Sequence, residues 1–145
     1  MRPSPDYEFV EGATSDLAFV ARGETLEEAF AAAAEALLAA TLDDPGTVEE
    51  RERRCLAFEE PDLELLLLRF LNELVYLRDA EDLLLHAGRL RVESNDRARL
   101  DAELWGEPIR PERHPLATEV KAVTAHALHV RATAHGWEAS VTLDV

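Results

Sequence analysis

The acidic residues at the carboxyl end of the chain are the first candidates for chemistry. Asp144 precedes Val145, so a side-chain carboxylate and a main-chain carboxylate stand one position apart. Fixed carboxylate oxygens suit a hard divalent cation, and we expect calcium, with magnesium or manganese as alternatives. Asp16, which opens an apolar-alternating segment, is the candidate for a third ligand. The alternative interpretation is that these residues are merely solvated at strand ends.

Common enzyme motifs are missing from the sequence. Its one lysine, Lys121, follows Thr-Glu-Val instead of closing a glycine-rich loop, so no phosphate-binding loop of the Walker type is present. The sequence also lacks Gly-x-Gly-x-x-Gly, His-Glu-x-x-His and Gly-x-Ser-x-Gly. A small metal-dependent hydrolase that activates water at the carboxylate cluster stays open as an alternative, although no general base accompanies the cluster.

The histidines and the cysteine favour structural roles. His126 and His129 lie three positions apart in a strand-like segment, where they would face opposite sides and could not share a zinc ion. We expect all five histidines to be surface or structural residues. Cys55 lacks a partner for a disulfide or a Cys-x-x-Cys site, and its strand-like surroundings predict a buried, unreactive thiol.

The composition limits the class of protein. A chain of 145 residues with 47% hydrophobic residues predicts a single domain, residues 1–145. Its net charge of −15 argues against strong direct binding to nucleic acid and favours cations or basic proteins as partners, unless the charge serves only solubility. The longest nearly apolar segment, residues 29–40, is too short to cross a membrane, so we expect a cytoplasmic protein with no membrane contact.

Apolar periodicity and end signals define the expected elements. A Thr25/Glu28 capping box opens a helix that Asp43 to Gly46 ends, and Asp62 caps a second helix that reaches about residue 78. Strands are expected at residues 7–10, 16–22, 48–60, 83–85, 89–92, 97–104, 127–133 and 137–145, with residues 117–124 open to strand or helix.

These elements predict an α+β fold. We expect a two-layer sandwich in which two main helices pack on one face of a mixed or antiparallel sheet. Gly88 is expected to form a turn, and Leu128, Val130 and Ala132 are expected to face inward.

Five blocks of the sequence, in order, resemble the archease family. They are Ala-Thr-Ser-Asp at residues 13–16 with Gly-Glu-Thr-Leu-Glu-Glu-Ala-Phe at 23–30, Leu-Val-Tyr-Leu-Arg-Asp at 74–79, Gly-Glu-Pro at 106–108 with Pro-Glu-Arg-His at 111–114, Thr-Glu-Val-Lys-Ala-Val-Thr at 118–124, and Leu-Asp-Val at 143–145. The resemblance extends from Tyr7 to Val145.

The resemblance implies an accessory protein and not an enzyme. Its partner would be the GTP-dependent tRNA-splicing RNA ligase that joins 3′-phosphate or 2′,3′-cyclic phosphate ends to 5′-hydroxyl ends, and it would promote guanylylation of the ligase histidine over many turnovers. By the same resemblance, Asp16, Lys121 and Asp144 are the functional residues, and Asp16, Asp144 and the Val145 carboxylate hold the metal. The family fold carries an inserted strand–helix–strand–strand module.

The sequence departs from the family motifs at three positions. Ala13 replaces the histidine of the His-Thr-Ala-Asp motif, and Ser15 replaces its alanine. Ala125 replaces the tyrosine of a later Tyr-His pair. The oxygen ligands and Lys121 are retained, so the expected site is not removed by these changes.

Overall fold

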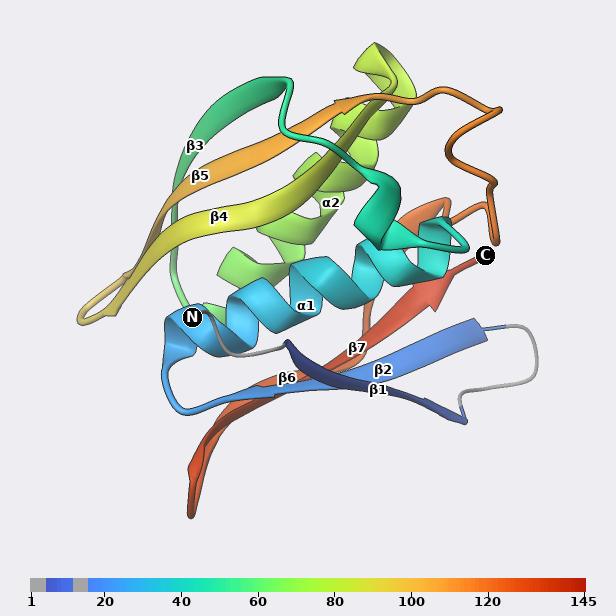
Figure 1. The fold of residues 1–145 in the computed structure, drawn as a ribbon. Helices are drawn as coiled ribbons and strands as arrows, with labels where there is room; N and C mark the ends of the chain where they lie inside the picture. Colours follow the sequence, from blue (N-terminus) through green and yellow to red (C-terminus); the bar gives the residue numbers. More distant parts are fainter. Residues whose placement is uncertain (1–4, 12–15) are drawn as a thin grey trace.

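Two antiparallel sheets enclose two long helices in the computed structural model, which describes residues 5–11 and 16–145 (Figure 1). In chain order the elements are β1 (Asp6–Glu11), β2 (Asp16–Gly23), α1 (Leu26–Thr41), the 3₁₀ turn η1 (Pro45–Thr47), β3 (Glu52–Glu60), α2 (Leu63–Glu81), β4 (Leu83–Ser94), β5 (Ala98–Pro108), β6 (Ala122–Thr133) and β7 (Gly136–Asp144). The strand order is β1-β2-β7-β6 in one sheet and β3-β5-β4 in the other.

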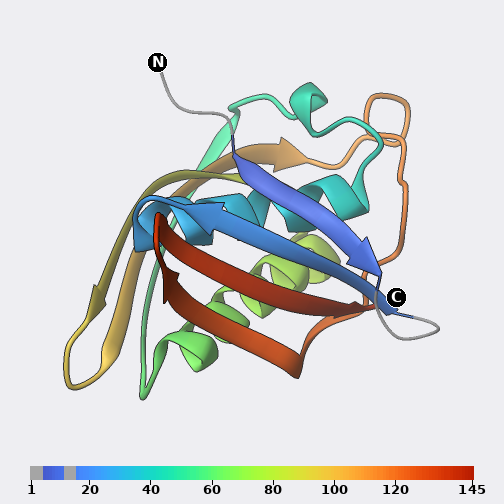
Figure 2. The same cartoon turned by 90° about the horizontal axis from the view of Figure 1, so that it is seen from below.

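The helices lie between the sheets. Helix α1 packs on β2 and β7 of the first sheet and on β4 of the second, whereas α2 packs on β6 and on β3, β4 and β5. Seen from below, the first sheet crosses both helices (Figure 2). The predicted α+β class and antiparallel pairing are confirmed. The expected inserted module consists of β3, α2, β4 and β5, and its three strands form a second sheet of their own.

The predicted helix starts are confirmed. The Thr25 hydroxyl accepts a hydrogen bond from the Glu28 amide at 3.1 Å, and Glu28 reaches back to accept from the Glu24 amide at 2.8 Å. Asp62 accepts from the Leu65 amide at 2.8 Å and caps α2. Helix α2 continues to Glu81, slightly beyond the prediction.

Helix α1 is buried on several sides, which explains its alanine content. Ala29, Ala33 and Ala36 are fully buried, and such small side chains let the helix approach two sheets and α2 together. Phe30 of α1 stacks on Phe70 of α2 with ring centroids 6.5 Å apart. The core is therefore centred on the contact between the two helices. Neither helix is long and apolar enough to span a membrane, within the described residues.

Gly88 does not form the predicted turn. It lies inside the continuous strand β4, at a bulge where the pairing with β5 shifts between Ala87 and Arg89. A Cβ atom at Gly88 would lie 2.8 Å from the carbonyl oxygen of Glu103, so the close approach of β5 requires glycine. The bulge bends the strand without ending it.

Two predicted burial states are wrong. Cys55 is exposed, because every second residue of β3 lies on the face of its sheet that points away from the helices. Ala132 is also exposed, in the part of the β6–β7 hairpin that extends past the helices (Figure 1). A register shift in β6 between Thr124 and His129, with Ala127 at φ 53°, breaks the uniform alternation assumed for this strand.

The tight fit of α1 can be tested by enlarging one buried alanine. We expect Ala36→Leu to lower the free energy of unfolding by about 1–3 kcal/mol, because the added atoms have no space between the layers. Urea denaturation followed by circular dichroism measures the change. The half-buried Ala39 of the same helix gives the control Ala39→Leu, with an expected change within about 0.5 kcal/mol. Equal losses in the two variants would contradict the packing argument.

Candidate functional site

Asp16 and Asp144 are brought together by the pairing of β2 with β7. They are direct partners in the antiparallel register, at the start of β2 and the end of β7. Opposed residues in an antiparallel pair project from the same face, with Cβ atoms roughly 4.5–5.5 Å apart. Asp144 is exposed and Asp16 is half-buried, so both carboxylates are available at this end of the central strands, here called the acidic tip.

Lys121 reaches the acidic tip through its main chain. Its amide donates a hydrogen bond to the carbonyl oxygen of Asp144 at 2.8 Å, just before β6 pairs with β7. Its side chain is exposed. Residues 16, 121 and 144 are distant in sequence, and the first sheet makes them neighbours.

Two residues of α2 hold the segment that carries Lys121. The Asn72 amide group donates to the Val123 carbonyl at 3.0 Å and accepts from the Val123 amide at 2.9 Å. The Arg78 guanidinium donates to the Val120 carbonyl at 2.5 Å. Sequence reasoning missed these roles, although the polar Asn72 directly after the apolar Phe70 and Leu71 was an available signal.

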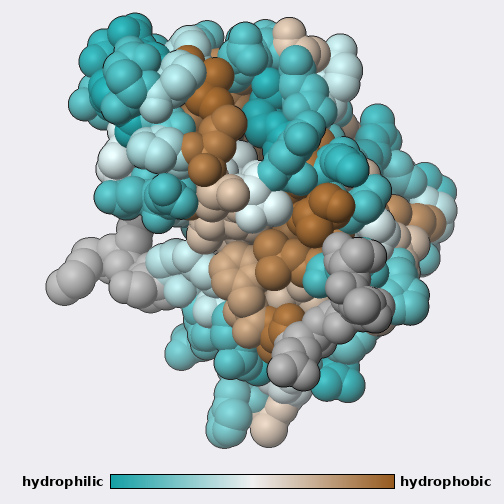
Figure 3. Space-filling view, turned by 90° about the vertical axis from the view of Figure 1, so that its right-hand side faces the viewer, coloured by the Kyte–Doolittle hydropathy of each residue, from teal (hydrophilic) through white to brown (hydrophobic). Residues whose placement is uncertain are grey.

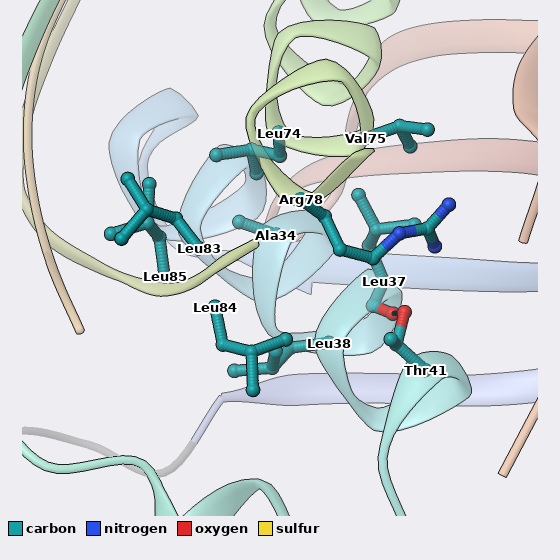
Figure 4. A pocket seen from close by; sticks show the side chains of 10 residues that line it. All are labelled: Ala34, Leu37, Leu38, Thr41, Leu74, Val75, Arg78, Leu83, Leu84 and Leu85. Atoms are coloured by element: carbon teal, nitrogen blue, oxygen red, sulfur yellow. Dashed lines mark hydrogen bonds between the residues drawn. The ribbon is translucent and has the colours of Figure 1, made fainter. Parts of the chain in front are cut away.

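Arg78 also borders a small gap between α1, α2 and β4 (Figure 4). The gap measures about 30 Å³ and is lined mainly by leucine side chains, with Thr41 and Arg78 at its polar side. Thr41 donates to the Leu37 carbonyl at 2.9 Å, so its hydroxyl is already bonded. The gap has room for about one water molecule and is a packing feature of the core.

A buried ionic cluster fixes the loop between β5 and β6. Glu107 and His114 are both fully buried. Arg113 donates to Glu107 at 3.0 Å, and the Glu49 amide donates to the same carboxylate at 2.6 Å. His114 Nδ1 accepts from the Arg110 amide at 2.9 Å, so Nε2 carries the proton that faces Glu107 Oε2 at 3.2 Å. The histidine is structural, as predicted.

The charge of Glu107 is stabilised by these partners. Burial alone would raise the pKa of its carboxyl group, but hydrogen bonds from the Glu49 amide, Arg113 and His114 outweigh burial and lower the pKa from 4.5 to about 2. The cluster anchors a loop whose later residues lead to Lys121. Within that loop Leu116 is 60% exposed.

The oxygen donors at the acidic tip fit a hard divalent cation better than zinc. The tip offers two opposed side-chain carboxylates, Asp16 and Asp144, and the adjacent Val145 packs its side chain partly against the core. Among residues 5–11 and 16–145, no three or more His, Cys, Asp or Glu side chains are grouped to hold a metal. The third ligand expected from the sequence is the main-chain carboxylate of Val145, which adjoins Asp144 in the chain. Ala13 and Ser15 lie outside the described residues.

Comparisons with known proteins identify the family. The model of the archease protein family matches residues 7–145. A protein archease of Methanosarcina mazei is 39% identical over 142 residues, which cover 96% of this chain and 95% of that protein. The chain belongs to the archease family. A protein archease of Thermococcus gammatolerans is 40% identical over 134 residues, covering 91% of this chain and 94% of the relative.

Solved structures agree with the archease fold. The solution structure of protein 1598 of Methanobacterium thermoautotrophicum matches with a TM-score of 0.82 and 33% identity, over 96% of this chain and 98% of that one. A crystal structure from Thermotoga maritima, of an archease described as a possible chaperone, matches with a TM-score of 0.64 over 100% of this chain and 97% of that one. At 20% identity the latter supports the fold alone.

The Glu107 cluster predicts a pH dependence of stability. Because the folded pKa is depressed, the carboxylate contributes stability above about pH 4.5 that is lost as the pH falls towards 2. We expect Glu107→Gln to be destabilised near pH 7, and its difference from the wild type to shrink between pH 4.5 and 2.5. Urea denaturation across this range measures the difference. The exposed control Glu112→Gln should show no such convergence, and a constant difference for Glu107→Gln would contradict the assignment.

Proposed function

We propose that this archease-family chain is a protein cofactor, and not an enzyme, that activates a cytoplasmic GTP-dependent tRNA-splicing RNA ligase. The ligase joins 3′-phosphate or 2′,3′-cyclic phosphate ends to 5′-hydroxyl ends of RNA. The accessory protein promotes guanylylation of the ligase histidine and so sustains multiple turnover. The observation that carries the proposal is the pairing of Asp16 with Asp144, beside a main-chain bond from Lys121.

Charge supports a protein partner with a basic groove. The chain carries a net charge of −15, and its acidic tip lies at the end of the first sheet where β2 begins and β7 ends. A ligase that binds RNA must present basic side chains around its active site, and opposite charge steers the two proteins together. This attraction weakens as salt is added.

Hydrophobic surface beside the tip also supports protein contact. Figure 3 shows brown side chains gathered on the side of the molecule where β7 ends and β2 begins. Leu116, in the loop that leads to Lys121, is the most exposed large hydrophobic residue of the described part of the chain. Apolar surface with a polar rim is typical of protein interaction sites.

The three functional residues have distinct roles in this proposal. Asp16, Asp144 and the Val145 carboxylate would hold a divalent cation, with calcium as the first choice and magnesium or manganese as alternatives. Such a cation supplies positive charge that offsets nucleotide phosphates. Lys121 contacts phosphate at the mouth of the ligase active site or offsets the tip carboxylates. Asn72 and Arg78 keep its main chain in place.

Removal of the tip side chains should weaken ligase activation. We expect Asp16→Ala, Lys121→Ala and Asp144→Ala to fold and to lower the stimulated rate of guanylylation by about tenfold to a hundredfold, since a lost charge-assisted contact costs about 1.5–3 kcal/mol. The assay follows radiolabelled GMP transfer to a matched ligase and multiple-turnover ligation. Glu112→Ala, which removes an exposed carboxylate elsewhere, is the control. Full stimulation by all three variants would remove the tip from the mechanism.

The main-chain carboxylate can be tested separately through metal binding. Adding a few residues after Val145 moves the free carboxylate away from Asp144 and should weaken calcium binding at least about tenfold, because a charged ligand is lost. Isothermal titration calorimetry of the purified protein gives the affinity without any ligase. An amino-terminal extension of equal length is the control. Unchanged calcium affinity in the carboxyl-terminal extension would show that this carboxylate is not a ligand.

A further inference from the structure

A large cavity lies on the outer side of α1, away from the acidic tip. Its volume is about 980 Å³, at the upper end of the size range of small-molecule sites. It is bordered by α1, by β4 around its bulge, and by the end of β2 with the turn between β6 and β7. Roughly 23 Å of strand, at about 3.3 Å a residue, separates Gly23 at the cavity from Asp16 at the tip.

The cavity is lined by negative charge. Six of its lining residues are acidic and one is an arginine, Arg22. The acidic residues are Asp6, Glu24, Glu27, Glu28, Glu35 and Glu138. Ion pairs offset part of this negative charge, since Glu138 contacts Arg22 at 3.4 Å and Arg131 at 2.9 Å. The surplus of carboxylates selects against anions and favours a cation.

Two indole rings border the same cavity. Trp105 of β5 and Trp137 of β7 line the cavity, and both are half-buried. Trp105 stacks on the His86 ring with centroids 4.4 Å apart. His86 is held by Glu35 at 2.8 Å and by the Pro45 carbonyl at 2.9 Å, which fixes the orientation of the stacked pair. The faces of indole rings attract organic cations.

Apolar contacts complete the lining between the charged groups. Ala31 of α1 and Leu90 of β4, both half-buried, offer surface for hydrocarbon chains. A bare metal ion would gain nothing from this apolar and aromatic surface. A molecule with separated positive groups on an aliphatic chain would use both parts of the lining.

We infer that this cavity binds an organic cation that bears alkylammonium or guanidinium groups. The charged groups lie against the carboxylates and the indole faces, and the aliphatic portions lie against Ala31 and Leu90. The source is a free polyamine or the basic side chains of a peptide segment, because both present the same groups. The inference does not rest on the proposed ligase activation, since it concerns the opposite end of β2.

Titration of the full chain with two probes tests the inference. Spermidine represents the free polyamine, and an amidated pentapeptide of alternating glycine and arginine represents a basic segment. We expect at least one probe to bind in isothermal titration calorimetry at low salt and to change tryptophan fluorescence. Binding of spermidine alone identifies a small-molecule site, and binding of the peptide alone identifies a segment of a partner chain. Failure of both probes to bind would overturn the inference.

Variants separate the cavity from the general acidic surface. Trp137→Leu should weaken binding of the active probe about fivefold to thirtyfold, because it removes a cation–π contact. Glu24→Gln should weaken it about threefold to tenfold, whereas the matched charge change Glu112→Gln should leave it unchanged. Circular dichroism confirms that each variant is folded. Equal effects of Glu24→Gln and Glu112→Gln, with no effect of Trp137→Leu, would show nonspecific attraction and overturn the inference.

Discussion

The register between β2 and β7 is the constraint on which the acidic tip depends. Phe19 pairs with Val141 and Leu17 pairs with Leu143, so this row of side chains faces the helices. Asp16 and Asp144 occupy the alternate row and face away. If either strand slipped by one residue, its two rows of side chains would change places and its carboxylate would face the core. The free energy of burying that charge is far larger than the loss of a single contact. Hydrophobic packing therefore aligns the two acidic residues without any direct attraction between them.

The inserted module, which consists of β3, α2, β4 and β5, helps to position the residues beside the acidic tip. Helix α2 belongs to the module, yet it packs on β6 of the first sheet and bonds the main chain around Lys121 through Asn72 and Arg78. The Glu107 cluster fixes the loop that enters this segment from β5. The position of the one lysine thus depends on contacts between both sheets, and changes in the module can act on the tip from a distance.

Local signals in the sequence predicted the elements well. Capping at Thr25 and Asp62 and the alternation along β7 follow from neighbouring residues alone, and they appear in the structure as expected. Exposure of Cys55 and continuity of β4 through Gly88 did not follow, because they depend on which face of the sheet packs on the helices and how closely β5 approaches.

The residues of the candidate site could be predicted only in part from the sequence. Asp16 and Asp144 were candidates from their residue types and positions, and Lys121 was added through family resemblance. The structure pairs the two aspartates and bonds the main chain of Lys121 to that of Asp144. The supporting residues Asn72 and Arg78 bond to main-chain atoms some 40 to 50 positions away in the sequence, so no local pattern indicates them. The residues that line the cavity beside α1 also come from distant segments of the chain. The sequence pattern does not determine which distant segments pair with one another in the fold.

The strand order has a consequence for folding of the chain. Strand β7 lies between β2 and β6, although it follows both of them in the sequence. Until β7 docks, β2 and β6 have no strand between them, so the edge of each strand that β7 covers is unpaired. A chain with these unpaired strand edges is prone to pair with other chains and to bind chaperones. Docking of β7 completes the first sheet and places Asp144 opposite Asp16 in the same step, so the acidic tip does not exist before this sheet has formed.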